Sequence, residues 1–118
     1  MSELATKHCV PCTGGVPPLS EEQTGPLLAQ LDAGWEIATR EDTKHGTVVF
    51  LRRRYRFPDF DKALGAAVRV GAIAEIQNHH PDLLVAWGML GVEIWTHKIG
   101  GLTESDFIFA AKCDKALR

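Results

Sequence analysis

The order of the predicted elements indicates an α+β domain in which a four-stranded antiparallel sheet carries helices on one face. Helix-start signals precede three segments, and two pairs of β-rich segments lie between them, which gives the order α-β-β-α-β-β-α. Each pair of strands is joined by a short turn, so its strands run antiparallel. A sheet with one apolar face needs a cover, and the helices supply it. We therefore expect a two-layer sandwich.

The first helix is expected from about Glu21 to Leu31. Ser20 and Gln23 have the spacing of a capping box, in which the two side chains satisfy backbone groups at the helix start. Pro26 lies inside this segment and costs a hydrogen bond there, so we expect the helix to start later or to kink.

Two strands should follow as a hairpin. Trp35–Thr39 is the first, Glu41–Gly46 is a polar turn, and Thr47–Phe57 is the second strand, rich in β-branched and aromatic residues. Its alternation places a set of larger side chains on one side of the sheet, namely Val49, Leu51, Tyr55 and Phe57.

The second helix should begin after Asp59, a good N-cap residue, and end near Asn78 or His79. Pro81 disfavours helical geometry at His80, which sets this end. The residues expected to face the sheet follow helical spacing and are Phe60, Ala63, Leu64, Ala67, Gly71 and Ala74.

A second hairpin is predicted from Asp82–Trp87 and Leu90–Thr96, with Gly88 and Met89 as a two-residue turn. Centring the hairpin there makes apolar pairs on one face: Trp87 with Leu90, Val85 with Val92, and Leu83 with Ile94. This register predicts Trp87 in the core. It also places His80 opposite His97, so the hairpin returns the chain to the end of the second helix.

The last helix should start after Thr103 and run to about Leu117, with Phe107, Ala110, Ala111 and Asp114 at helical spacing. Three histidines, His79, His80 and His97, thus meet at one place. Histidine gives and takes protons near neutral pH, so such a cluster suits an elimination of water. Two carboxylates can support it: Glu75 from the second helix and Asp106 from the last. The alternative is a polar helix end without a chemical role.

Other functions are disfavoured by the sequence. The net charge is -2, without the basic excess typical of a nucleic-acid binder. Arg52, Arg53 and Arg54 form a local basic run, which we interpret as a solvated strand face. The apolar stretches are interrupted by charge, so no membrane span is expected. An odd number of cysteines without a signal peptide favours reduced thiols and the cytoplasm.

Metal binding is the main chemical rival. Zinc commonly takes histidine ligands, but these three lack a familiar zinc spacing, and adjacent side chains such as His79 and His80 point in different directions. We expect neither a metal nor another cofactor. Cys9 and Cys12 form a lone Cys-x-x-Cys pair, which we interpret as two thiols in an N-terminal arm. The alternatives are a redox pair or a zinc site completed by a histidine. Residues 1–18, dense in glycine and proline toward their end, are expected to form this irregular N-terminal arm before a single domain over residues 19–118.

Together these residues resemble a known family. The pattern runs through Glu75, His79-His80-Pro81, Trp87, Thr96-His97, Gly101-Leu102-Thr103 and Asp106. It is similar to the signature of the pterin-4a-carbinolamine dehydratases, and the arm resembles a microbial branch of that family. The resemblance implies a metal-free, homodimeric or homotetrameric enzyme on the two-layer α+β fold. It further implies dehydration of 4a-hydroxytetrahydropterin, the product of aromatic amino acid hydroxylases, to quinonoid dihydropterin in tetrahydropterin recycling.

The resemblance also implies roles for single residues. His79 and His97 correspond to the general acid–base pair, and His80 to a histidine that contacts the pterin. Glu75 and Asp106 correspond to supporting carboxylates, and the residues expected to bind substrate are Asn78, Pro81, Trp95 and Thr96. Two positions depart from the pattern: Asn78 stands where many members are acidic, and Leu83 where many are aromatic. Because relatives also act as protein partners, a non-catalytic binding or assembly factor on this fold is the alternative.

Overall fold

The fold of the chain is described from a computed structural model over residues 3–10 and 17–118. The elements follow the predicted order, preceded by one turn of 3-10 helix. Their bounds are η1 Leu4–Thr6, α1 Glu21–Leu28, β1 Glu36–Asp42, β2 Gly46–Arg56, α2 Phe60–Gln77, β3 Asp82–Ala86, β4 Met89–Ile94 and α3 Glu104–Leu117. The α+β class is therefore confirmed.

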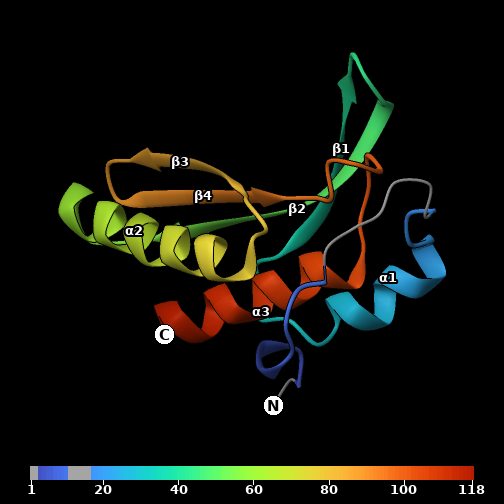
Figure 1. Ribbon diagram of the computed structural model, residues 1–118. Coiled ribbons are helices and arrows are strands. Elements are labelled where there is room, and N and C mark those ends of the chain that lie inside the picture. Colours follow the sequence, from blue (N-terminus) through green and yellow to red (C-terminus); the bar gives the residue numbers. More distant parts are fainter. Residues whose placement is uncertain (1–2, 11–16) are drawn as a thin grey trace.

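The sheet is a four-stranded antiparallel layer in the order β1-β2-β4-β3. Figure 1 shows α2 and α3 side by side on one face of this sheet, with α1 beyond α3. The inner face of the sheet carries apolar side chains that are almost fully buried against these helices: Leu51, Leu90, Val92 and Ile94. This arrangement is the expected two-layer sandwich, and burial of its apolar face is the main force that holds it together.

The helix starts follow the local capping signals. Ser20 and Gln23 form the predicted capping box at α1, which begins at Glu21 despite Pro26 and ends at Leu28, before the expected Leu31. The Asp59 carboxylate accepts a hydrogen bond of 2.8 Å from the backbone N–H of Lys62 at the start of α2. Each cap satisfies a backbone donor that has no partner within its helix.

The buried face of α2 differs from the predicted one. Ala63, Ala67 and Ala74 are buried as expected, but Phe60 and Leu64 are 43% and 45% exposed. Ala66 and Val70 complete the buried stripe instead. The small side chains let α2 approach the sheet closely, and the larger ones at positions 60 and 64 lie at the side of the helix that the sheet does not cover.

The second hairpin has a different turn from the one predicted. Ala86 pairs with Met89 and Val85 with Leu90, so the turn residues are Trp87 and Gly88. Gly88 has a left-handed backbone (φ 67°), as the second central residue of a type II turn requires. Relative to the predicted register, each residue of β4 pairs with a residue two positions earlier in β3. A displacement of two keeps the same side chains on the inner face. Trp87 is consequently 75% exposed, and its prediction as a core residue was wrong.

The N-terminal segment that was expected to be irregular packs against α3. Leu4 is 2% exposed and belongs to the core, and the Lys112 ammonium donates a hydrogen bond of 2.8 Å to the Ala5 carbonyl. Cover from this segment, α2 and the sheet explains why α3 is buried along most of its length. Cys12 and the glycines that follow it lie outside the described residues.

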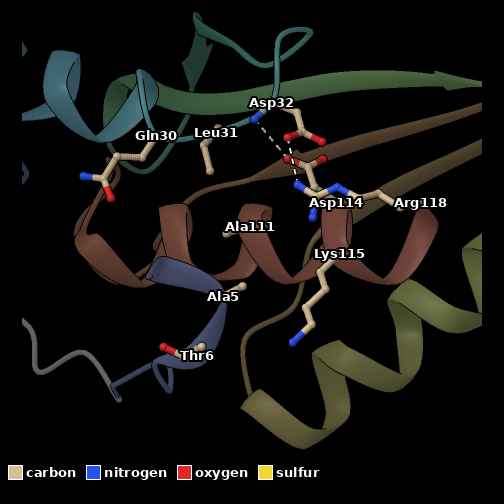
Figure 2. A pocket seen from close by; sticks show the side chains of 9 residues that line it. All are labelled: Ala5, Thr6, Gln30, Leu31, Asp32, Ala111, Asp114, Lys115 and Arg118. Atoms are coloured by element: carbon tan, nitrogen blue, oxygen red, sulfur yellow. Dashed lines mark hydrogen bonds and ion pairs between the residues drawn. The ribbon is translucent and has the colours of Figure 1, made fainter. Parts of the chain in front are cut away.

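A buried carboxylate ties α3 to the sheet. Asp114, 3% exposed, accepts hydrogen bonds from the Tyr55 hydroxyl at 2.6 Å, the Trp35 indole at 3.0 Å and the Arg53 guanidinium at 2.7 Å. Burial, with the Asp114 carboxylate, raises the pKa of Tyr55. Figure 2 shows Asp114 beside Asp32 at a cavity of about 160 Å³, which none of the predicted site residues lines. The carboxylate thus has a structural role.

Candidate active site

The turn at the end of α2 sets the directions of two histidines. Asn78 adopts a left-handed backbone (φ 51°), which asparagine tolerates better than most residues. The backbone N–H of His79 then donates to the Ala74 carbonyl at 3.1 Å and closes the helix. Because the chain leaves the helix at this point, the two neighbouring imidazoles, His79 and His80, have separate partners.

His79 is held by a buried carboxylate. Its Nε2 lies 2.6 Å from Oδ1 of Asp106, which is fully buried, and the imidazole itself is 16% exposed. An ionised carboxylate only accepts hydrogen bonds, so Nε2 carries the hydrogen in this pair. Nδ1 is then the ring nitrogen that the carboxylate does not occupy, as in other histidines that an aspartate orients.

The second oxygen of Asp106 organises the start of α3. Oδ2 accepts hydrogen bonds from the Thr96 hydroxyl at 2.9 Å and from the Thr103 backbone N–H at 2.8 Å. The first turn of a helix also favours a negative charge. The carboxylate is therefore rigidly placed, and it links the end of α2, the loop after β4 and α3 at one point.

His80 is held by the other predicted carboxylate. Its Nε2 lies 2.6 Å from Oε2 of Glu75, and both side chains are exposed, at 54% and 78%. Glu75 therefore orients His80 and not His79, which lies one helical turn after it. In water such an exposed pair contributes little to stability, but it restricts the imidazole.

His97 lies in the loop that follows β4. Its ring packs against Trp95 in a tilted contact, with the ring centroids 4.3 Å apart and an angle of 41° between the planes. The loop is fixed by Thr96, whose backbone N–H donates to Gly101 and whose carbonyl accepts from Gly100. The predicted pairing of His80 with His97 is wrong, because β3 and β4 stop pairing at Asp82 and Glu93.

The three histidines nevertheless line one cavity of about 300 Å³, with Asn78, Trp95, Thr96 and Lys98. Glu75 and Asp106 stand behind it as partners of His80 and His79, and Pro81 is not among its lining residues. Lys98 was missed because no pattern in the sequence marks it. Strand alternation alone likewise does not predict which carboxylate meets which imidazole.

The rival chemistries have less support in the described residues. Within residues 3–10 and 17–118, no three His, Cys, Asp or Glu side chains are grouped so that they could hold a metal ion. The Cys9 thiol donates to the Ser105 carbonyl at 3.4 Å, and burial raises its pKa to about 11. A thiol that stays protonated is a poor nucleophile and metal ligand. Its predicted partner Cys12 lies outside the described residues. No helix in residues 3–10 and 17–118 combines the length and the apolar character that a membrane span needs.

Comparisons with known proteins identify the family of this chain. Residues 17–116 match the sequence model of a family described as Pterin 4 alpha carbinolamine dehydratase. A relative from Rubrobacter xylanophilus that carries the pterin-4-alpha-carbinolamine dehydratase name is 54% identical over 98% of this chain and 99% of its own length. A mitochondrial relative from Arabidopsis thaliana, pterin-4-alpha-carbinolamine dehydratase 2, is 46% identical over 98% of this chain and 59% of its own length.

A solved structure shows the same fold. The crystal structure of a transcriptional coactivator/pterin dehydratase from Brucella melitensis superposes with a TM-score of 0.72 and 29% identity, covering 86% of this chain and 99% of that one. The fold and the names of these relatives thus indicate a small α+β hydro-lyase. The chain belongs to the pterin-4a-carbinolamine dehydratase family, as the resemblance predicted.

Proposed function

We propose that this protein dehydrates 4a-hydroxytetrahydropterin to quinonoid dihydropterin by histidine acid–base catalysis. The observation that carries the proposal is the cavity in which His79, oriented by buried Asp106, and His97 occur together. Family membership supports a pterin as the substrate. A hydroxylase that leaves its pterin cofactor hydroxylated at C4a would supply this substrate, which places the reaction in tetrahydropterin recycling.

The reaction needs two proton transfers at neighbouring atoms. The 4a-hydroxyl receives a proton and leaves as water, the C4a–O bond breaks, and the N5 electron pair forms the C4a=N5 double bond while N5 loses its proton. His79 and His97 divide these transfers. Asp106 stabilises the positive charge that appears when His79 takes up a proton, so the imidazole keeps its orientation throughout.

The remaining lining residues bind and shield the substrate. His80, restrained by Glu75, offers a ring nitrogen to the polar edge of the pterin, and Trp95 offers an aromatic wall. Asn78 and Thr96 contribute polar groups to the same cavity. Pro81 acts indirectly, by ending α2 so that both histidines leave the helix.

The proposal is tested by the dehydration of freshly generated 4a-hydroxytetrahydropterin, followed by ultraviolet absorbance. We expect acceleration that a chelator does not change and that disappears in the His79→Ala/His97→Ala double variant. The His8→Ala variant removes an exposed imidazole that does not line the cavity and should keep full activity. A well-folded wild-type protein that gives no acceleration would contradict the proposal and favour a protein-binding role.

That second role has its own support. The Brucella relative is titled both coactivator and dehydratase, and α2 exposes apolar side chains at Leu64, Val68 and Ile76. β1 and β3 are also free sheet edges within the described chain. Independently of that role, we propose that the same surfaces assemble the protein into a homodimer or homotetramer. Light scattering of Val68→Asp should then show a smaller oligomer than wild type, and an unchanged mass would contradict it.

A further inference from the structure

His97 is held in a different way from the other two histidines of the cavity. His79 and His80 each have a carboxylate partner. Among the described residues, the ring nitrogens of His97 have no hydrogen-bond partner, and its imidazole is exposed and rests on the Trp95 ring. The direction of this imidazole therefore depends on where the indole of Trp95 lies.

Trp95 is in turn held by residues that do not line the cavity. The Arg40 guanidinium carbon lies 4.6 Å from the centroid of the Trp95 ring and 4.5 Å from that of Phe50. The Phe50 and Trp95 rings are themselves 6.0 Å apart. Arg40 on β1 thus joins Phe50 of β2 to Trp95, the residue against which His97 packs. Each of the two cation–π contacts is attractive.

The head of Arg40 is fixed at the same time. Its Nη1 donates to Oε1 of Glu93 at 2.7 Å, and its Nη2 lies 3.5 Å from Oδ2 of Asp82. Glu93 precedes Trp95 by two residues, so the ion pair of Arg40 with Glu93 and its ring contact with Trp95 lie on the same face of the sheet. A planar guanidinium can make ion pairs at its edge and ring contacts with its face, whereas a lysine ammonium has no planar face for two rings.

We propose that Arg40 is a positioning residue for the reaction, which acts on His97 through Trp95. The inference rests on the proposed function, because it takes His97 as a proton-transfer group. Arg40 does not line the cavity, so it has no direct contact with a substrate there. The loss of Arg40 frees the Trp95 ring, so the imidazole of His97 loses its fixed packing partner. Proton transfer then slows because its geometry is less often correct.

The test compares Arg40→Ala and Arg40→Lys with the matched variant Arg52→Ala. Arg52 also pairs with a glutamate, with Nη2 at 2.6 Å from Oε1 of Glu36, and its guanidinium carbon lies 6.0 Å from the Phe50 ring. It has no such contact with Trp95 among the described residues. Arg52→Ala therefore removes a similar ion pair and cation–π contact but none of the direct contacts of Trp95.

For Arg40→Ala we expect kcat to fall about threefold to tenfold with KM within about twofold of wild type. Arg52→Ala should keep the kcat of wild type at a similar melting temperature. The imidazole resonance of His97, identified by its absence in His97→Ala, should shift in Arg40→Ala because the ring current of Trp95 changes. Arg40→Lys should restore the melting temperature more completely than kcat.

Different outcomes separate the two proposals. If wild-type protein has no dehydratase activity, or His97→Ala keeps full activity, the proposed role of His97 fails. If His97→Ala loses activity but Arg40→Ala keeps its kcat and its His97 resonance, Arg40 has no positioning role. Equal losses of kcat in Arg40→Ala and Arg52→Ala would also overturn the inference, as would a rise in KM at unchanged kcat.

Discussion

Asp106→Asn is the substitution that most sharply separates the chemical role of this carboxylate from its structural one. The side chain keeps its shape, but one oxygen becomes an NH2 group. If the amide oxygen keeps the contacts that Oδ2 makes with Thr96 and Thr103, the NH2 group faces Nε2 of His79. Nε2 must then accept a hydrogen bond, and the imidazole hydrogen moves to Nδ1, the nitrogen that has to exchange protons.

The expected magnitude follows from these contacts. Hydrogen bonds to a charged group contribute about 1.5–3 kcal/mol each to stability. The asparagine amide in the variant keeps part of this contribution, because it can still form hydrogen bonds. We therefore expect kcat about 10- to 100-fold lower, because the imidazole starts from the wrong tautomer and loses the charge that stabilises its protonated form. The free energy of unfolding should fall by about 1–2 kcal/mol, since the carboxylate also caps α3.

The assay is dehydration kinetics together with urea denaturation of the same preparation. Asp59→Asn is the matched control, because Asp59 caps α2 through the backbone N–H of Lys62 and is remote from the cavity. It should cost at most about 1 kcal/mol of stability and leave kcat unchanged. A folded Asp106→Asn variant with kcat within about twofold of wild type would refute the view that Asp106 orients His79.

Three further predictions concern stability. Asp114→Asn should cost about 2–4 kcal/mol in urea denaturation, because the largely buried Arg53 loses the nearer of its two carboxylate partners and keeps only Asp32 at 3.8 Å. A cost under about 1 kcal/mol would show that Asp114 is dispensable. Burial raises the pKa of the Cys9 thiol from the ordinary 9.0 to about 11, so the unfolded chain loses this proton first and stability should fall as the pH rises over this range. Cys9→Ser should lessen that fall in urea denaturation, and an identical pH profile would contradict this. Trp87→Ser should change the unfolding free energy by less than about 0.5 kcal/mol, since the indole is 75% exposed; a loss typical of a core tryptophan would support the discarded register.

Local signals predicted the elements well because their causes are local. Ser20, Asp59 and Thr103 precede the three helices as expected, and each helix start depends on groups within a few residues of it. The α+β class follows from the order of these elements and from short turns between strands. The sequence-based predictions of fold class and family were both confirmed by the structure and its relatives.

The register of the second hairpin was missed for a physical reason. A displacement of two residues keeps every apolar side chain on its face, so alternation supports both registers equally. The choice depends on whether Gly88 is the first or the second central residue of the turn, and glycine suits both. The same limit applies to α2, where Phe60 and Leu64 are apolar but lie outside the stripe that meets the sheet.

The contents of the cavity were predicted better than its internal contacts. All three histidines line it, although the strand pairing that was expected to bring His80 opposite His97 does not exist. Residues distant in sequence decide the contacts: Asp106 meets His79 from another helix, and Arg40 reaches Trp95 from β1. Such pairings depend on how the layers pack, which periodicity and capping do not describe.

The most direct test of the account is the dehydration rate of His79→Ala, His97→Ala and their double variant, each checked for folding. We predict that each single variant keeps a reduced turnover and that the double variant falls to the rate without protein while it stays folded, with a lower melting temperature because buried Asp106 loses its contact with His79. Turnover that survives in the folded double variant would contradict the acid–base assignment. Unfolding of the double variant would show that the two histidines hold the structure together instead.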